Sequence, residues 1–282
     1  MAFLYLISTI LGVSVQNITK KMFTQKNGGK GVYFFGLMTS FAAMMFFVVT
    51  SSGFEWDSGL ILYAVLFAVS YAAATVFGVA AVAYGSLSIT SLIVSYSLMI
   101  PTVYGLVVLK DPVSVGLFPG IALLLISLFL VNHKDSSSPV NAKWIVCVCL
   151  AFAGNGLCSL FQKLQQVEFN GGFKNEFMIL SLAIVVILLG ITVFATEKKD
   201  VKTTFKSGWY IALAFGVANG AVNLFVMILS NIMPVSLMFP LISAGGIIIT
   251  YLISKFIYKE NLTKKQFIGF LIGVASVIFL NI

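Results

Sequence analysis

The sequence contains no arginine, and only 9% of its 282 residues are charged. Soluble domains usually carry about 25% charged residues, so this chain has too few charges to cover a globule in water. Its hydrophobic fraction is 60%, and its mean hydropathy is +1.05. This composition excludes a soluble enzyme, a nucleic-acid-binding module and a secreted disulfide scaffold, and it predicts an all-α polytopic membrane protein.

Residues that usually carry catalysis or metal binding are also scarce. The three cysteines, Cys147, Cys149 and Cys158, lie in one apolar segment and are interpreted as packing residues. The single histidine, His133, lies in a polar stretch. Without arginine the chain has no guanidinium pair to grip a phosphate, and it has no P-loop motif for ATP. We expect no cofactor, no metal and no enzymatic activity.

Apolar runs divide the chain into ten expected membrane spans, because a hydrocarbon core about 30 Å thick needs about 20 apolar residues in a helix. The expected helices are 2–22, 31–51, 59–83, 87–109, 113–132, 143–163, 175–196, 207–230, 235–257 and 264–281. The polar stretch 133–142 is interpreted as a linker. It separates a first five-helix half, 1–132, from a second, 143–282.

The two halves align when the sequence is shifted by 149 residues. The aligned pairs are Lys110 with Lys259, Asp111 with Glu260, Ser114 with Thr263, Gly120 with Gly269, Ser127 with Ser276, Asn132 with Asn281 and, in the third and eighth helices, Ser70 with Asn219. Because each half has an odd number of helices, the second half enters the membrane from the opposite side. We therefore predict two inverted five-helix repeats, a plan that recurs in secondary transporters.

The lysines predict the orientation of the chain. Fourteen of the 17 lysines fall in loops on one side of the expected membrane, and Lys110, Lys163 and Lys174 fall on the other. Loops rich in lysine face the cytoplasm. This distribution predicts that both termini lie outside the plasma membrane.

The acidic turns at 110–114 (KDPVS) and 259–263 (KENLT) are followed by Gly120 and Gly269. Together with the ten helices, they resemble EamA-type members of the drug/metabolite transporter superfamily. The resemblance implies a ten-helix secondary transporter, with export favoured over import. This superfamily carries amino acids, sugars, nucleotide sugars and drugs, so the resemblance does not define a substrate.

Two features depart from the family pattern. Leu98 and Ile247 stand where the family has a proline ahead of the acidic turn, whereas Pro101 and Pro240 lie elsewhere on those helices. Any kink of these helices is therefore expected to be displaced. Familiar members of the family have cytoplasmic termini, which is opposite to the orientation that the lysines predict here.

No Asp, Glu, Lys or His lies near the middle of an expected span. Small multidrug members of the superfamily use a glutamate in the first helix to exchange protons for cationic drugs, and the first helix here has no acidic residue. Ionisable residues inside the membrane are usually functional. Their absence argues against a proton-coupled exporter of cationic drugs and leaves uncharged groups to recognise the cargo.

Uncharged polar side chains in the spans are the candidate substrate-binding residues. Asn219 and Asn223 are four residues apart and share a helix face, and Asn155 lies between two glycines. An amide in hydrocarbon must face another helix or water, so these residues either join helices or line a cavity. The predicted substrate-binding set is Tyr71, Ser95, Tyr96, Asn155, Asn219, Asn223 and Ser243, in which the two tyrosines are expected to stack on the substrate.

These observations predict a secondary transporter of a small neutral or zwitterionic metabolite, such as an amino acid, that works by alternating access between the two repeats. Its expected partners are this small-molecule substrate and the lipid bilayer, with no nucleic acid; a monomer and a homodimer both remain open. The alternatives are a sugar or drug carrier of the same fold, an integral-membrane enzyme that modifies lipids, and a non-transporting scaffold. An enzyme needs His, Asp, Glu or Cys clustered at one membrane face, whereas the acidic residues here are scattered among loops.

Overall fold

The computed structural model describes residues 2–28, 30–84, 90, 93–94, 96–132, 142–256 and 263–280, and this part of the chain is all-helical, as predicted. The helices are α1 (Ala2–Asn27), α2 (Val32–Thr50), α3 (Leu60–Tyr84), η1 (Tyr96–Leu98), α5 (Met99–Val107), α6 (Leu117–Asn132), α7 (Ala142–Glu168), α8 (Lys174–Thr196), α9 (Val201–Ile232), α10 (Val235–Phe256) and α11 (Lys264–Leu280). Ser95, residues 133–141 of the predicted linker and residues 259–262 of the second acidic turn lie outside the described residues.

Within the described residues, six helices are long and apolar enough to cross a membrane: α1, α2, α3, α7, α8 and α9. Shorter apolar helical stretches, Tyr96–Val107, Leu117–Leu130 and Val235–Gly246, accompany them. Large apolar side chains also face outward, since Val49 is 78% exposed and Phe194 is 70% exposed. A helix satisfies all its backbone groups internally, so this fold suits a chain whose outer surface contacts lipid.

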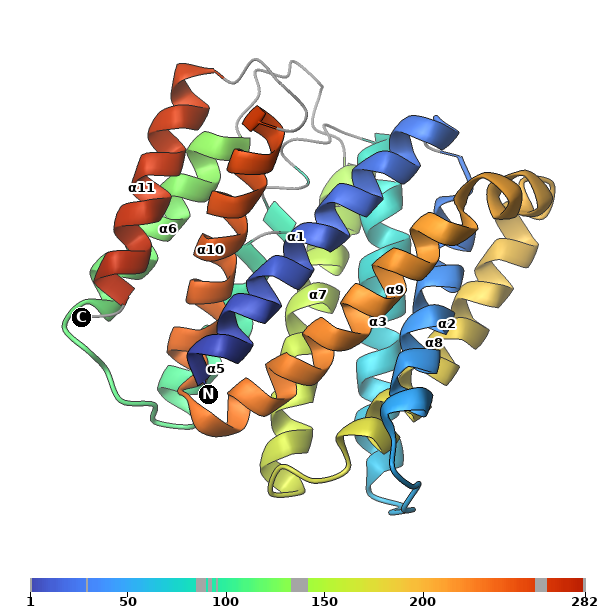
Figure 1. Cartoon of the computed structure of the whole chain (residues 1–282), viewed down its shortest axis with the longest axis horizontal. Coiled ribbons are helices and arrows are strands. Elements are labelled where there is room, and N and C mark those ends of the chain that lie inside the picture. Colours follow the sequence, from blue (N-terminus) through green and yellow to red (C-terminus); the bar gives the residue numbers. More distant parts are fainter. Residues whose placement is uncertain are drawn as a thin grey trace.

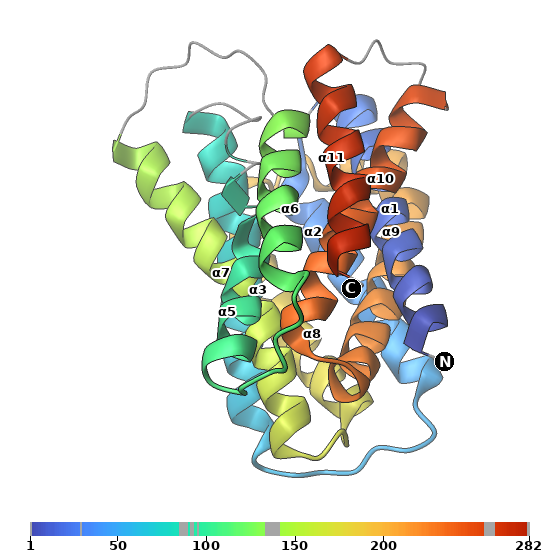
Figure 2. The same cartoon turned by 90° about the vertical axis from the view of Figure 1, so that its left-hand side faces the viewer.

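The helices run up and down one bundle, and their connections gather at its two ends (Figures 1 and 2). The α1–α2 and α8–α9 connections and the start of α11, all rich in lysine, lie at the upper end of Figure 1. The α2–α3, α7–α8 and α9–α10 connections lie at the lower end, and the free ends of α1 and α11 also point that way. This arrangement separates the lysine-rich connections from the others.

Several helices extend beyond the predicted spans. α1 continues to Asn27 instead of residue 22, α7 continues to Glu168 instead of residue 163, and α9 begins at Val201 instead of residue 207. Hydropathy finds only the part of a helix that crosses hydrocarbon, whereas the helix itself continues until the backbone prevents it. Gly28, with a left-handed φ of 58°, follows α1, and Pro234 follows α9.

The prediction of one continuous helix over 87–109 is wrong. The described part of this segment contains the 3-10 turn η1 followed by α5, which ends at Val107. Pro101 lies in the first turn of α5, where its missing N–H is tolerated. Pro240 lies inside α10, where it removes one hydrogen bond of the helix. The two displaced prolines thus occur in two helices that pack against each other, α5 and α10.

The main helix contacts come in pairs that relate the two halves of the chain. α1 packs on α9 as α7 packs on α3, and α2 packs on α9 as α8 packs on α3. α1 also packs on α10 as α7 packs on α5, while α6 and α11 pack on each other. Each contact becomes its counterpart when every helix is replaced by the helix at the same position in the other half, that is α1 by α7, α2 by α8, α3 by α9, α5 by α10 and α6 by α11. A two-fold axis between two similar units produces contacts of this kind.

The contact between α6 and α11 is reciprocal at the level of single atoms. The Ser127 hydroxyl donates to the Gly269 carbonyl oxygen over 2.7 Å, and the Ser276 hydroxyl donates to the Gly120 carbonyl oxygen over 2.8 Å. Both serines are buried. These four residues form two of the pairs that the 149-residue shift aligns. The same position in each half therefore makes the same bond to the other half.

Glycines bring helices of the bundle into close backbone contact. A Cβ atom at Gly154 of α7 would lie 2.6 Å from the carbonyl oxygen of Ser70 and 2.8 Å from the nitrogen of Ala74, both in α3. A Cβ atom at Gly216 of α9 would lie 2.6 Å from the carbonyl oxygen of Thr39 in α2. These glycines allow helices of the same chain to pack as closely as small-residue motifs do in membranes.

We expect Gly154→Ala to destabilise the bundle by about 1–3 kcal/mol, because the added methyl group meets backbone atoms of α3 that cannot move aside. Gly53→Ala is the matched control, since a Cβ atom there meets nothing within 4 Å. Thermal unfolding of the detergent-solubilised protein measures both effects. Equal unfolding temperatures for the two variants would contradict the close contact between α3 and α7.

Candidate functional site

Four amide side chains from three helices form a continuous hydrogen-bonded chain inside the bundle. Gln162 of α7 donates from Nε2 to Oδ1 of Asn223 in α9 over 2.6 Å. Asn223 donates from Nδ2 to Oδ1 of Asn219 over 3.0 Å and to the backbone carbonyl oxygen of Asn219 over 2.8 Å. Asn219 donates from Nδ2 to Oε1 of Gln16 in α1 over 3.4 Å. We call these four residues the amide chain.

Helix periodicity and helix packing together place the amide chain. Asn219 and Asn223 lie one turn apart on the same face of α9, and α9 packs on both α1 and α7. Gln162 is buried in α7, with 4% of its surface exposed. Figure 1 shows α1 and α9 crossing in front of α7, and Figure 2 shows α1 and α9 together at one side of the bundle. The amide chain therefore lies where a helix of the first half meets two helices of the second half.

A second group of amides lies beside the amide chain, toward the α7–α8 connection. Asn231 of α9 donates to Oε1 of Gln166 in α7 over 2.8 Å. Gln166 donates to the side chain of Gln165, which in turn donates to the Gly172 carbonyl oxygen over 3.1 Å. Gln162 and Gln166 are one turn apart, so the contact between α7 and α9 is lined by amides from the centre of the bundle toward its lower end.

Asn155 bonds to the first half of the chain. It donates from Nδ2 to the hydroxyl oxygen of Ser97 over 2.6 Å, and Ser97 is fully buried in η1. Asn155 precedes Gln162 by two helical turns, about 10 Å along the same face of α7. Asn155 therefore joins two helices, and it does so on the face of α7 that carries the amide chain.

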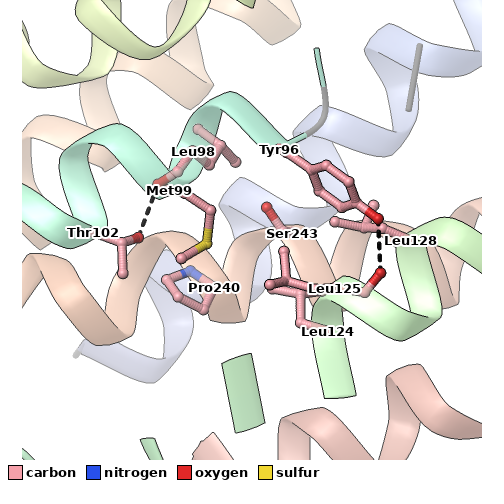
Figure 3. Close-up of a pocket in the computed structure, with 9 residues that line it drawn as sticks. All are labelled: Tyr96, Leu98, Met99, Thr102, Leu124, Leu125, Leu128, Pro240 and Ser243. Carbon is pink, nitrogen blue, oxygen red and sulfur yellow. Dashed lines mark hydrogen bonds between the residues drawn. The ribbon is translucent and has the colours of Figure 1, made fainter. Parts of the chain in front are cut away.

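Tyr96 and Ser243 line a small cavity between η1, α5, α6 and α10 (Figure 3). The Tyr96 hydroxyl donates to the carbonyl oxygen of Leu125 in α6 over 2.9 Å, the bond drawn at the side of the ring in Figure 3. The cavity volume is about 10 Å³, which is room for one water molecule at most. In this conformation the cavity does not hold a metabolite, although it brings two predicted site residues together.

Tyr71 packs against an apolar cluster that α3 shares with α2, α7, α8 and α9. Its ring stacks on Phe67, with ring centroids 5.9 Å apart. The neighbouring Ser70 donates to the carbonyl oxygen of Leu66 in its own helix over 2.7 Å. The structure therefore places Tyr71 against an aromatic side chain of the protein, in the position where a stacking substrate was expected.

The sequence predicts only part of the amide chain. Asn219 and Asn223 do share a face and are bonded, whereas Gln16 and Gln162 are absent from the predicted set. The sequence signal for Gln162 is its spacing from Gln166, four residues apart like the two asparagines. The predicted span 143–163 contains Gln162 but not Gln166, so it does not bring out this pair. Ser95 lies outside the described residues.

The amide chain offers neutral donors and acceptors. Among the described residues, no group of three or more His, Cys, Asp or Glu side chains could hold a metal ion, and all three cysteines are free. Amide side chains do not gain or lose protons near neutral pH. This arrangement can orient the polar groups of a ligand by hydrogen bonds.

A separate hollow of about 470 Å³ lies at the start of α9, lined by Lys202, Thr203, Lys206 and Ser207. Lys206 and Asn219 belong to the same helix, and their separation in sequence places them about 20 Å apart along its axis. The hollow at the lysine-rich end is therefore distinct from the amide chain.

The comparisons with known proteins define the fold alone. No protein-family model and no curated protein sequence matches this chain. Several solved structures match, among them one described simply as the crystal structure of a protein, with a TM-score of 0.80 and 12% sequence identity over 99% of this chain and 95% of the other. An identity this low shows a shared fold and leaves function open. The class defined here is an all-helical bundle whose described part contains six helices long and apolar enough to span a membrane.

Gln162→Leu and Asn223→Leu are each expected to destabilise the protein by about 1–3 kcal/mol, because each leaves a partner amide buried without its hydrogen bond. The double variant should fall short of the sum of the single effects by roughly 0.6–1.7 kcal/mol, the coupling found for hydrogen bonds between membrane helices. Unfolding of all four proteins in detergent measures this coupling. Strict additivity would contradict the bond between the two side chains.

Proposed function

We propose that this chain is a secondary transporter, in the plasma membrane, of a small neutral or zwitterionic metabolite such as an amino acid. The observation that carries the proposal is the amide chain, which joins α1 of the first half to α7 and α9 of the second. Polar groups inside a membrane bundle commonly mark substrate pathways. Transporters built from two repeats bind their cargo between the repeats.

The proposal includes ten membrane spans arranged as two inverted repeats. Three features support it: the six long apolar helices with their shorter companions, the exchange-related contacts of the two halves, and the reciprocal bonds of Ser127 and Ser276. Five spans in each half make the second half inverted relative to the first. The resemblance of the acidic turns to EamA-type transporters points to the same arrangement, and export is the proposed direction.

In the proposed mechanism, one half rocks against the other. The bonds from Gln162 to Asn223 and from Asn223 to Asn219 lie within the second half and move as a unit. The bond from Asn219 to Gln16 joins the halves and, at 3.4 Å, is the longest in the amide chain. Weak bonds are the easiest to exchange, so a cargo that enters between α1 and α9 takes over the partners of this bond.

The chemistry of the amide chain favours a cargo without net charge. Amides pair with carbonyl, carboxylate, ammonium and hydroxyl groups, whereas a nucleotide sugar calls for cations to hold its phosphates, and the chain has no arginine. A free sugar is the second candidate, because its hydroxyl groups also pair with amides.

Proteoliposomes are expected to transport at least one compound from a panel of the twenty L-amino acids and neutral sugars. Asn219→Ala combined with Asn223→Ala should reduce this transport at least tenfold, because the amide chain loses both central members; each tenfold step corresponds to about 1.4 kcal/mol. Asn175→Ala, at the start of α8, is the matched control. Transport at the wild-type rate by the double variant would remove both asparagines from the site.

The lysine-rich end is proposed to face the cytoplasm, with both termini outside. In a variant whose Cys147, Cys149 and Cys158 are replaced by alanine, Ser52→Cys in the α2–α3 connection should react with an impermeant maleimide in intact cells. Lys199→Cys in the α8–α9 connection should react only after the membrane is opened. The reverse labelling pattern would establish cytoplasmic termini instead.

A further inference from the structure

The amide chain ends in a hydrogen-bond donor that has no acceptor. Within the described part of the chain, Nε2 of Gln16 is buried without a partner, while Oε1 of the same side chain accepts from Asn219. The other buried side-chain atoms without a partner there are Nδ2 of Asn27 and Oγ of Ser236, at the end of α1 and the start of α10. Gln16 therefore combines an unpaired buried donor with a place in the candidate site.

The direction of the chain is set by a backbone carbonyl group. Nδ2 of Asn223 lies 2.8 Å from the carbonyl oxygen of Asn219, which can only accept, so this end of the Asn223 amide must be the donor. Oδ1 of Asn223 then faces Gln162, and Gln162 must donate. The same reasoning gives Asn219 its orientation, because its oxygen accepts from Asn223 and its Nδ2 is left to face Gln16.

The orientation of each amide group fixes the orientation of the next one, and Gln16 is the last side chain in the series. Its oxygen must face the Asn219 donor, so its NH₂ group points away from the amide chain. Aligned hydrogen bonds polarise one another in a medium of low dielectric constant. The free NH₂ group is therefore the electropositive end of a chain of four amides, and a ligand that binds there must bring an acceptor.

Resting on the transport function proposed above, we infer that Nε2 of Gln16 binds a carboxylate oxygen of the cargo. A charged acceptor makes a stronger hydrogen bond with an N–H donor than a neutral one does, so a carboxylate satisfies this end of the chain best. An ammonium group, the form that a primary amine takes near neutral pH, would set one donor against another. The cargo class is thus a zwitterionic carboxylic acid, recognised by α1 through its carboxylate.

Matched ligand pairs test the inference on the wild-type protein. The probes are L-leucine with 3-methylbutylamine and L-phenylalanine with 2-phenylethylamine, pairs that differ by the carboxylate, together with the remaining L-amino acids. Ligand-induced thermal stabilisation in detergent and uptake into proteoliposomes are the two measurements. At least one amino acid should be bound, and its decarboxylated amine should bind at least tenfold more weakly.

Variants of Gln16 test whether its Nε2 atom is responsible for binding the carboxylate. Gln16→Glu keeps the shape but puts an oxygen in place of the NH₂ group, so it should lower amino-acid affinity at least tenfold. Gln16→Met removes the donor without adding charge and should also lower affinity. Gln25→Glu makes the same change at an exposed position of the same helix and should leave affinity unchanged. Elution as a single species from a sizing column establishes that each variant is folded.

The outcomes separate this inference from the proposed function. Amino-acid transport that is equal in wild type and in a folded Gln16 variant, or equal affinity for an amino acid and its amine, would overturn the inference and leave a transporter standing. Transport of neutral sugars without binding of any amino acid would overturn both the carboxylate assignment and the amino-acid cargo. If both Gln16 variants fail to fold, the wild-type comparison of acid and amine decides the question.

Discussion

Hydrocarbon contains no water that could satisfy a polar group, and this constraint shapes the chain at every level. The backbone meets it by forming helices. Short hydroxyl side chains meet it within their own helix, as Thr9, Ser14 and Ser181 do by donating to the carbonyl oxygen four residues earlier. The longer amides of Gln162 and Asn155 bond to neighbouring helices instead. Among the hydroxyl groups, those of Ser127 and Ser276 also reach a neighbouring helix, so amides and a few hydroxyl groups together make the polar contacts between helices.

Glycine and serine together satisfy polar groups at the contact of α6 with α11. Gly120 has no side chain, so the Ser276 hydroxyl reaches its carbonyl oxygen, and a Cβ atom at Gly120 would lie 2.7 Å from the side chain of Leu280. In each of the two helices the glycine precedes the serine by seven residues, Gly120 and Ser127 in α6 and Gly269 and Ser276 in α11, so both residues lie on one helix face. Close packing and hydrogen bonding thus depend on each other at this contact.

The fold follows from the sequence more completely than the site does. Hydropathy locates the described helices, and the 149-residue shift pairs Ser127 with Ser276, two residues that make equivalent bonds. Hydropathy does not find the turn at η1 or the C-terminal end of α1, because these depend on local backbone geometry. Periodicity shows that Asn219 and Asn223 share a face, but it does not show which helices that face meets. That Gln16 and Gln162 are the partners of this face is therefore seen only when α1, α9 and α7 are packed together.

The two halves satisfy the same constraint differently, and the difference indicates where the proposed movement begins. The 149-residue shift pairs Ser70 with Asn219 and Ala74 with Asn223. On α3, the Ser70 hydroxyl is satisfied by its own helix, and a glycine of α7 packs directly on the backbone. On α9, the two amides instead reach α1 through a 3.4 Å bond to Gln16. A close contact of glycine on backbone offers a ligand few partners to exchange, whereas the amide contact offers donors and acceptors. For the transporter proposed above, we therefore propose that the contact between α1 and α9 opens to cargo and that the contact between α3 and α7 is its pivot.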